Sequence, residues 1–197
     1  HPMTVEKIEQ GPNQVIIWLS IENQSETGYF CADKNIYVMD ALTNKKYKLI
    51  QSKGIPVCPE NHYFQSVGEI LTFQLIFPRF GSGTKYINLI EECQANCFTI
   101  KGIILDPGLN KEIDLGYHNY LTGKPELSLA VFQQSIKNYP DYPFGILYFN
   151  LIQLFAEKND SGSAKNFYRQ LVNSKFQDKN EVISRLKQQA YYTRLIF

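Results

Sequence analysis

Apolar and polar side chains alternate with a period of two through most of the first hundred residues. The two faces of segment 14–23 carry different residues: Val15, Ile17, Leu19 and Ile21 on one, and Ile16, Trp18 and Ser20 on the other. Leu71, Phe73, Leu75 and Phe77 repeat the pattern in segment 70–78. We expect Trp18 and Phe73 to be core residues. The alternative is that the face with Val15 is the inner one, which leaves Trp18 outside.

The same alternation predicts about seven strands in this half of the chain. They fall at segments 4–9, 14–23, 35–41, 46–52, 70–78, 86–92 and 98–104. Seven short strands in roughly a hundred residues are typical of an immunoglobulin-like sandwich, with an open barrel as the alternative. We expect this β domain to cover residues 3–106.

The periodicity becomes helical after Asp106-Pro107-Gly108, and segment 108–111 is expected to be a linker. The second domain is therefore expected at residues 112–197 and to be all α. The predicted fold class is α+β with two domains.

The stretch "GYHNYLTGKPELSLAVFQQSIKNYPDYP" resembles a tetratricopeptide repeat, with matches at Leu115-Gly116, Gly123, Ser128, Phe132 and Pro140. A second unit follows, with Tyr148, Leu151 and Phe155 on one helix and Ala164, Tyr168 and Leu171 on the next. The resemblance implies two helical hairpins whose helices approach closely at the small residues Ser128 and Ala164. Asn119 and Ile152 depart from the family pattern.

A last helix is expected over segment 181–197, begun by Asp178 or Asn180 as a cap. Ile183, Leu186 and Ala190 form its apolar stripe, which would cover the open end of the second repeat. The terminal segment 195–197 is expected to pack on its own domain.

The chain has four cysteines, and whether they form disulfides indicates the cellular compartment of the protein. A turn at Thr43-Asn44 would fold segments 36–41 and 46–52 into a hairpin, and its symmetry places Cys31 near Cys58. A short loop can bring Cys93 and Cys97 within disulfide reach. We expect both disulfides and therefore an extracytoplasmic location, in the periplasm or at the cell surface. Free buried thiols, or a metal or redox site, are the alternatives.

The stretch "GEILTFQLIFPRFGSGTKYINLIEEC", followed by "NCFTIKGIIL", resembles the closing strands of an immunoglobulin-like domain found in exported proteins of Bacteroidetes-type bacteria. The resemblance implies export and a sandwich fold, and it brings no catalytic residues. His1-Pro2-Met3 is expected to be a cloning remnant, so a removed secretory signal and a lipid anchor upstream both stay open.

Charge and motifs narrow the function further. Lys plus Arg number 20 and Asp plus Glu 19, for a net charge of +1, so we expect no nucleic-acid partner. No apolar run reaches the roughly 20 residues of a membrane-spanning helix. The sequence contains no G-x-S-x-G motif, no H-E-x-x-H motif and no glycine-rich phosphate loop. His62 is expected in an exposed loop, His118 at the surface of the first repeat helix, and segment 45–48 at a lysine-protected strand edge. We expect no cofactor, no metal site and no enzymatic activity.

The remaining candidates for binding are aromatic and amide side chains at the junction of the two repeats: Asn138, Tyr139, Tyr142, Tyr148 and Asn150. Packing between helices is the simpler interpretation of the tyrosines. The functional one is a surface that holds a protein or peptide partner, with the sandwich as a docking or spacer module. The alternative function is a carbohydrate- or cell-surface-binding module that uses the sandwich.

Overall fold

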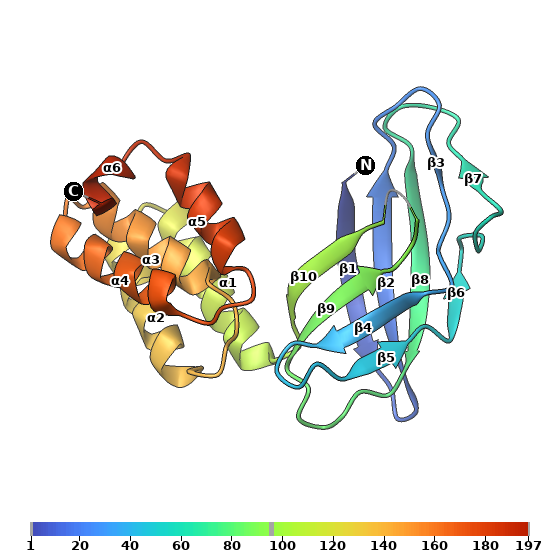
Figure 1. Cartoon of the computed structure of the whole chain (residues 1–197), viewed down its shortest axis with the longest axis horizontal. Helices are drawn as coiled ribbons and strands as arrows, with labels where there is room; N and C mark the ends of the chain where they lie inside the picture. The colour runs from blue at the N-terminus through green and yellow to red at the C-terminus, as the bar shows by residue number, and fades with distance from the viewer. Residues whose placement is uncertain (1, 95–96, 197) are drawn as a thin grey trace. The chain divides into compact units, whose positions relative to one another are not determined.

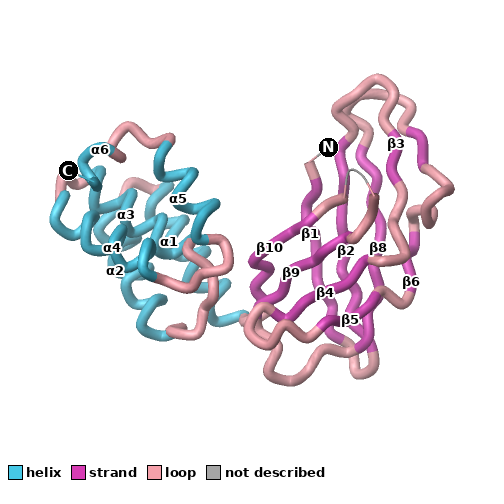
Figure 2. Tube along the Cα trace, in the orientation of Figure 1, coloured by secondary structure: helices cyan, strands magenta, loops and turns pink. Residues whose placement is uncertain are grey.

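The computed structural model describes residues 2–94 and 97–196. The chain divides into two compact units, His1–Ile103 and Ile104–Phe197. Strands make up the first unit and helices the second (Figure 2), so the predicted α+β class and the order of its two parts are confirmed.

Within its described residues, the β unit contains two four-stranded sheets (Figure 1). The first has the order β1 (Met3–Gln10), β2 (Gln14–Glu22), β8 (Ile70–Pro78) and β6 (Gln51–Lys53). The second has the order β10 (Thr99–Ile104), β9 (Tyr86–Glu91), β4 (Ile36–Asp40) and β5 (Lys46–Lys48). A separate ladder pairs β3 (Tyr29–Phe30) with β7 (His62–Tyr63).

The core of the β unit follows the alternation of the sequence. Val15, Ile17, Leu19 and Ile21 of β2 are all buried, whereas Trp18 is only half-buried. Phe73 is buried on β8, opposite Leu19. The face with Val15 is therefore the inner one, and the expectation of a fully buried Trp18 is wrong because it lies on the opposite face.

Segment 46–52, expected to be one strand, is split between the two sheets. The Leu49 N–H donates to the Ile36 carbonyl of β4, and the next amide, Ile50 N–H, donates to the Ile76 carbonyl of β8. The chain thus changes sheets between two neighbouring residues. The sequence does not show this switch because either sheet supplies a backbone acceptor.

Cys31 is bonded to Cys58 and Cys93 to Cys97, with Cα atoms 5.3 and 5.5 Å apart, as the sequence predicts. The predicted hairpin forms between β4 and β5, but it ends at Leu49 and so does not bring Cys31 to Cys58. An isolated parallel bridge between Ala32 and Val57 instead brings the two segments together.

The described residues of the second unit form six helices: α1 (Pro107–Leu121), α2 (Pro125–Asn138), α3 (Ile146–Glu157), α4 (Ser161–Asn173), α5 (Lys179–Lys187) and α6 (Thr193–Ile196). Neighbours from α1 to α4 pack on one another in sequence, and α5 contacts α3 and α4. No helix of the described part of the chain is long and apolar enough to cross a membrane.

Helices α1 and α2 approach closely at small residues. A Cβ atom added at Gly116 would lie 2.6 Å from the Phe132 ring. Ser128 and Ala164 are fully buried, as predicted for small positions inside helix pairs. Gly123 takes a φ of +73° in the turn between α1 and α2, where glycine is favoured.

Two predictions about the helix ends are wrong. Segment 108–111 is the first turn of α1 and not a linker, because the Asp106 carboxylate accepts hydrogen bonds from the Gly108 and Leu109 N–H groups. The expected final helix breaks into α5 and α6, and its buried stripe is Val182 and Leu186.

Asp178 stands at the predicted start of α5, but its side chain does not cap that helix. It accepts from the Gly145 N–H at the start of α3 at 2.7 Å and so ties the two helices together. Leu195 is buried, while Phe197 lies outside the described residues.

Candidate binding sites

A row of aromatic and polar side chains lies on neighbouring sides of α1 and α3. We call it the tyrosine–amide face; its members are Tyr117, Tyr120, Asn150, Gln153 and Glu157. Residues three or four apart share one side of a helix, which places each set in a single stripe. Tyr117 and Tyr120 are 39% and 36% exposed.

Hydrogen bonds join the two helices across this face. The Asn150 amide donates to the Tyr117 hydroxyl at 3.0 Å, and the Tyr120 hydroxyl donates to a Glu157 carboxylate oxygen at 2.9 Å. Gln153 donates to the same Glu157 oxygen at 2.8 Å. The bond to Glu157 raises the pKa of Tyr120, with burial as a second cause. The side chains are thus held in place, with the two tyrosines partly exposed to solvent and Asn150 buried.

A small pocket of about 40 Å³ lies beneath the tyrosine–amide face, with Ser128, Phe132 and Leu154 among its walls. The Ser128 hydroxyl is buried and has no hydrogen-bond partner in the described part of the chain. A buried hydroxyl without a partner is costly, so a group entering this pocket would gain by bonding to it. The pocket has room for a water or the tip of a small side chain.

The five residues predicted for binding are divided between different places. Tyr139, Tyr142 and Tyr148 line a second hollow of about 150 Å³ near Pro140. Asn150 belongs to the tyrosine–amide face.

Asn138 lines neither of these hollows. Its amide donates to Glu112 at 2.8 Å and its carbonyl oxygen accepts from Gln134.

In the second hollow, two of the three tyrosines pack against neighbouring aromatic rings. Tyr142 is buried and its ring meets that of Phe144 edge-on, with centroids 5.6 Å apart. Tyr148 packs on Phe167 and Phe176, and burial raises its pKa. Sequence reasoning missed Tyr117, Tyr120, Gln153 and Glu157, although the three-residue spacing of the two tyrosines was a usable signal.

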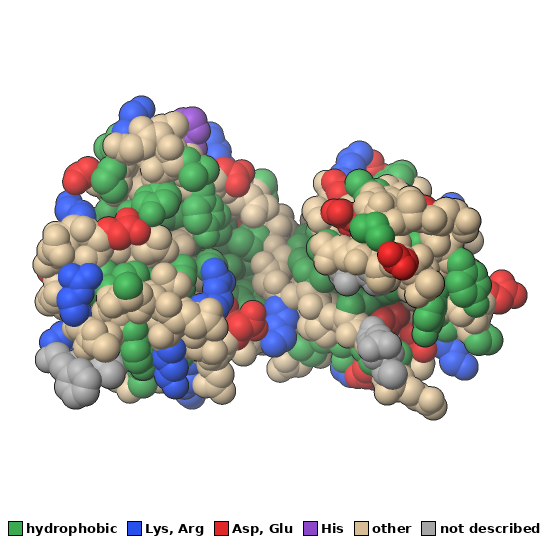
Figure 3. All heavy atoms as spheres, turned by 90° about the horizontal axis from the view of Figure 1, so that it is seen from above, with side chains coloured by type: hydrophobic (Ala, Val, Ile, Leu, Met, Phe, Trp, Pro, Cys, Tyr) green, Lys and Arg blue, Asp and Glu red, His purple; other side chains and the backbone are tan. Residues whose placement is uncertain are grey.

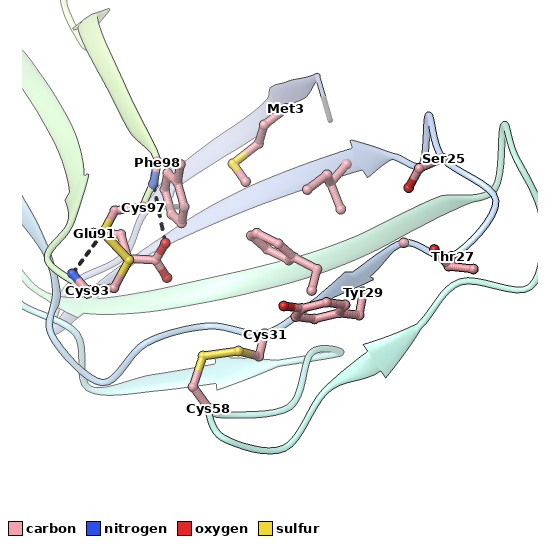
Figure 4. Close-up of a pocket in the computed structure, with 13 residues that line it drawn as sticks. Met3, Ser25, Thr27, Tyr29, Cys31, Cys58, Glu91, Cys93, Cys97 and Phe98 are labelled. Carbon is pink, nitrogen blue, oxygen red and sulfur yellow. Dashed lines mark hydrogen bonds between the residues drawn. A yellow bond between two sulfur atoms is a disulfide. The ribbon is translucent and has the colours of Figure 1, made fainter. Parts of the chain in front are cut away.

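The β unit holds a larger cavity of about 650 Å³, which we call the β-unit cavity (Figure 4). Its walls carry three aromatic rings, three hydroxyls, one carboxylate and both disulfides: Tyr29, Phe30, Phe98, Ser25, Thr27, Glu91, Cys31–Cys58 and Cys93–Cys97. Met3, Ile21 and Gly28 complete the lining. This cavity could not be predicted from the sequence, because its walls come from segments distant in the chain.

Glu91 ends β9 with its side chain directed inward, and the residue is only 6% exposed. Its two carboxylate oxygens accept from the Asp33 N–H at 2.9 Å and the Phe98 N–H at 3.3 Å. Burial raises the pKa of this carboxyl, and the nearby Asp33 charge raises it further. The adjacent Glu92 lies at the surface and bonds to Tyr37 and Lys46 instead.

The other chemically active side chains have surface partners. His62 lies on β7, not in the expected loop, and its Nε2 is 3.2 Å from Glu69. Lys46 lies on β5, an edge strand, and its ammonium group is 4.1 Å from the centre of the Tyr37 ring. No three His, Cys, Asp or Glu residues among those described lie close enough together to hold a metal ion.

Charges of both signs are interspersed over the visible face of each unit, without a patch of one sign (Figure 3). No protein-family model and no curated protein matches the chain.

Proposed function

We propose that this chain is a non-catalytic, exported interaction protein whose tyrosine–amide face binds an extended segment of a partner protein. The observation that carries the proposal is the pairing of exposed tyrosine rings with fixed amide side chains above a pocket with a buried, unpartnered hydroxyl. In this proposal the β unit is a docking or spacer module.

The chemistry of the face suits a peptide. Tyrosine offers a large contact area at a low cost in side-chain entropy, and amide side chains can both donate to and accept from a peptide backbone. Leu121 lies one residue beyond Tyr120 and is 81% exposed, which adds apolar surface at the end of the row. A small side chain of the partner would enter the pocket and bond to Ser128.

The packing of the helices supports a tetratricopeptide-like arrangement. Gly116 lies directly against the Phe132 ring, and Ser128 and Ala164 occupy corresponding buried positions in the two hairpins. Repeats of this kind commonly present binding surfaces made by side chains from successive units. The tyrosine–amide face, with members from α1 and α3, has this composition.

The order of the strands supports an immunoglobulin-like sandwich. With β3 and β7 left aside, lettering the other strands along the chain turns the two sheet orders into A-B-E-D and G-F-C-C′. This is the arrangement expected of that fold. Two disulfides support export, because they persist in oxidising compartments.

Selection of peptides from a displayed random library on the full chain tests the proposal. We expect the selected peptides to lose about tenfold or more in affinity for Tyr117→Ala, as for a central interface residue. Tyr63→Ala, which removes an exposed tyrosine of the β unit, is the matched control and should bind normally. Equal binding to Tyr117→Ala, or selection of no peptide at all, would refute the proposal.

A second candidate function is glycan or cell-surface binding by the β unit. The observation that favours it is the pair Tyr29 and Tyr63, which are 56% and 63% exposed with ring centroids 6.1 Å apart. Sugar rings stack on such aromatic surfaces. Binding to a glycan array that Tyr63→Ala abolishes and Tyr117→Ala leaves intact would favour this function over peptide binding.

A further inference from the structure

We propose that the β-unit cavity binds an organic cation through its ammonium group, with Glu91 as the counter-charge. The proposal concerns a different unit from the tyrosine–amide face and does not depend on the function proposed for that face.

The size and the lining of the β-unit cavity fit a small ligand. Its volume of about 650 Å³ falls within the range of roughly 300–1,000 Å³ that is typical of ligand pockets. Figure 4 shows the Glu91 carboxylate on the same cavity wall as the Phe98 ring, with Tyr29 across from them. A ligand inside would therefore meet one acidic group and several rings.

The charge of Glu91 is the main argument for a cation. Its carboxylate is almost fully buried, and its only hydrogen-bond partners among the described residues are two backbone N–H groups. The residues that line the cavity in the described structure include no Lys, Arg or His. Burying a carboxylate without an opposite charge is costly, so a bound ammonium group would supply the charge that the protein does not.

The pKa of Glu91 agrees with this view. Burial raises this pKa, which means that the surroundings disfavour the negative charge of the carboxylate. An ammonium group next to the carboxylate would act in the opposite direction and lower the pKa.

The aromatic walls add a second attraction for a cation. The rings of Phe30 and Phe98 have centroids 6.3 Å apart, and Tyr29, the other residue of β3, also lines the cavity. Ring faces attract cations through their quadrupole. Anionic ligands are disfavoured at the same place, because Glu91 and Asp33 would repel them.

Ammonium groups occur on free amines, on lysine side chains and on amino sugars, and the test separates these sources. Amide chemical-shift perturbation is measured on the full chain with cadaverine, Nα-acetyl-lysine methylamide and glucosamine. The neutral counterparts 1,5-pentanediol, Nα-acetyl-norleucine methylamide and glucose serve as controls. The amides of Asp33 and Phe98 bond directly to Glu91, so they are the reporters for binding.

We expect at least one ammonium probe to shift both reporter amides in a saturable way, while its neutral counterpart does not. The probe that binds most tightly identifies the source. Equal shifts with the neutral compound would overturn the proposal, and a response to glucose alone would support the glycan candidate instead. No shift with any ammonium probe up to about 10 mM, where even a weak complex registers, would also overturn it.

Two variants test the roles of charge and rings. Glu91→Gln should weaken the ammonium probe about tenfold or more, whereas Glu60→Gln, which removes an exposed carboxylate outside the cavity lining, should leave its affinity unchanged. Tyr29→Leu alters an exposed ring and should fold normally, with affinity about threefold to tenfold weaker.

If Glu91→Gln fails to fold, Tyr29→Leu decides the question alone. Unchanged affinity in Tyr29→Leu, or in a folded Glu91→Gln, contradicts the proposal.

Discussion

At the scale of single residues, Tyr191 is a buried polar group that the fold leaves unsatisfied. Its hydroxyl has no hydrogen-bond partner in the described part of the chain, whereas the hydroxyl of neighbouring Tyr192 lies 3.1 Å from that of Tyr168. Of these two adjacent tyrosines, one therefore has a hydroxyl without a hydrogen bond and the other has a hydroxyl with one. Removing each hydroxyl should have opposite effects on stability.

Tyr191→Phe should raise the free energy of unfolding by about 1 kcal/mol. The substitution removes a hydroxyl that loses its hydrogen bonds to water on folding and forms none in the folded protein. Tyr192→Phe is the matched control and should lower the free energy of unfolding by about 1 kcal/mol through loss of the bond to Tyr168. Chemical denaturation followed by far-ultraviolet circular dichroism measures both. A loss of stability in Tyr191→Phe would show that its hydroxyl has a partner.

The same hydroxyl predicts a dependence on alkaline pH. Burial is the main cause that raises the pKa of Tyr191 to about 12 from its ordinary value of 10.0. Between these two values the unfolded chain loses the proton and the folded chain keeps it. Stability should therefore be unaffected by Tyr191 below pH 10 and should fall as pH rises from 10 toward 12.

Thermal unfolding at several alkaline pH values measures this fall. In Tyr191→Phe, stability should fall less steeply over the same pH range than in the natural chain, because the Tyr191 hydroxyl no longer titrates. Some fall should remain, because the other tyrosines still titrate. An identical slope would contradict the assignment to Tyr191.

At the scale of secondary-structure elements, the contact between α1 and α2 depends on Gly116. Gly116→Ala would place a Cβ atom 2.6 Å from the Phe132 ring and should destabilise the helical unit by about 1–3 kcal/mol through overpacking. Gly162→Ala is the control. Its Cβ would meet only Asp160, at 3.6 Å, and alanine favours a helix by about 1 kcal/mol.

Denaturation of the two variants should thus give shifts of opposite sign. If both variants gain stability, α1 can move away from Phe132 without cost, and the close helix approach is not required.

At the scale of the whole molecule, the two disulfides close loops of different length. Cys31 and Cys58 are 27 positions apart, and Cys93 and Cys97 are 4 apart. The chain-entropy model gives about 3–4 kcal/mol for the longer loop and about 2 kcal/mol for the shorter one. Replacing Cys31 and Cys58 by serine should therefore cost more stability than replacing Cys93 and Cys97.

Denaturant midpoints of the two double variants test this order. Thiol titration of the oxidised, denatured natural chain should find no reactive thiol. Four reactive thiols would show that neither disulfide forms, and the proposal of export would then lose its support.

The sequence predicted the features that depend on local periodicity and failed where distant segments meet. Period-two alternation separated the two faces of β2 but did not show which of them is the inner one. The predicted position of Asp178 marked the start of α5. The cavity around Glu91 could not be predicted, because nothing in the sequence distinguishes Glu91 from its neighbour Glu92. Only the fold shows that Glu91 is the buried one. The break between α5 and α6 was missed because the apolar pattern continues through Tyr191 and Leu195.

The change of sheet at Leu49 and Ile50 offers a way to ask whether the sandwich opens as one body. The Leu49 amide is protected by the Ile36 carbonyl of one sheet, and the Ile50 amide by the Ile76 carbonyl of the other. Native-state hydrogen exchange of these two neighbours therefore reports on both layers within one peptide unit. Equal free energies of exchange would mean that the layers separate cooperatively. A faster rate at one amide would show which layer loosens first.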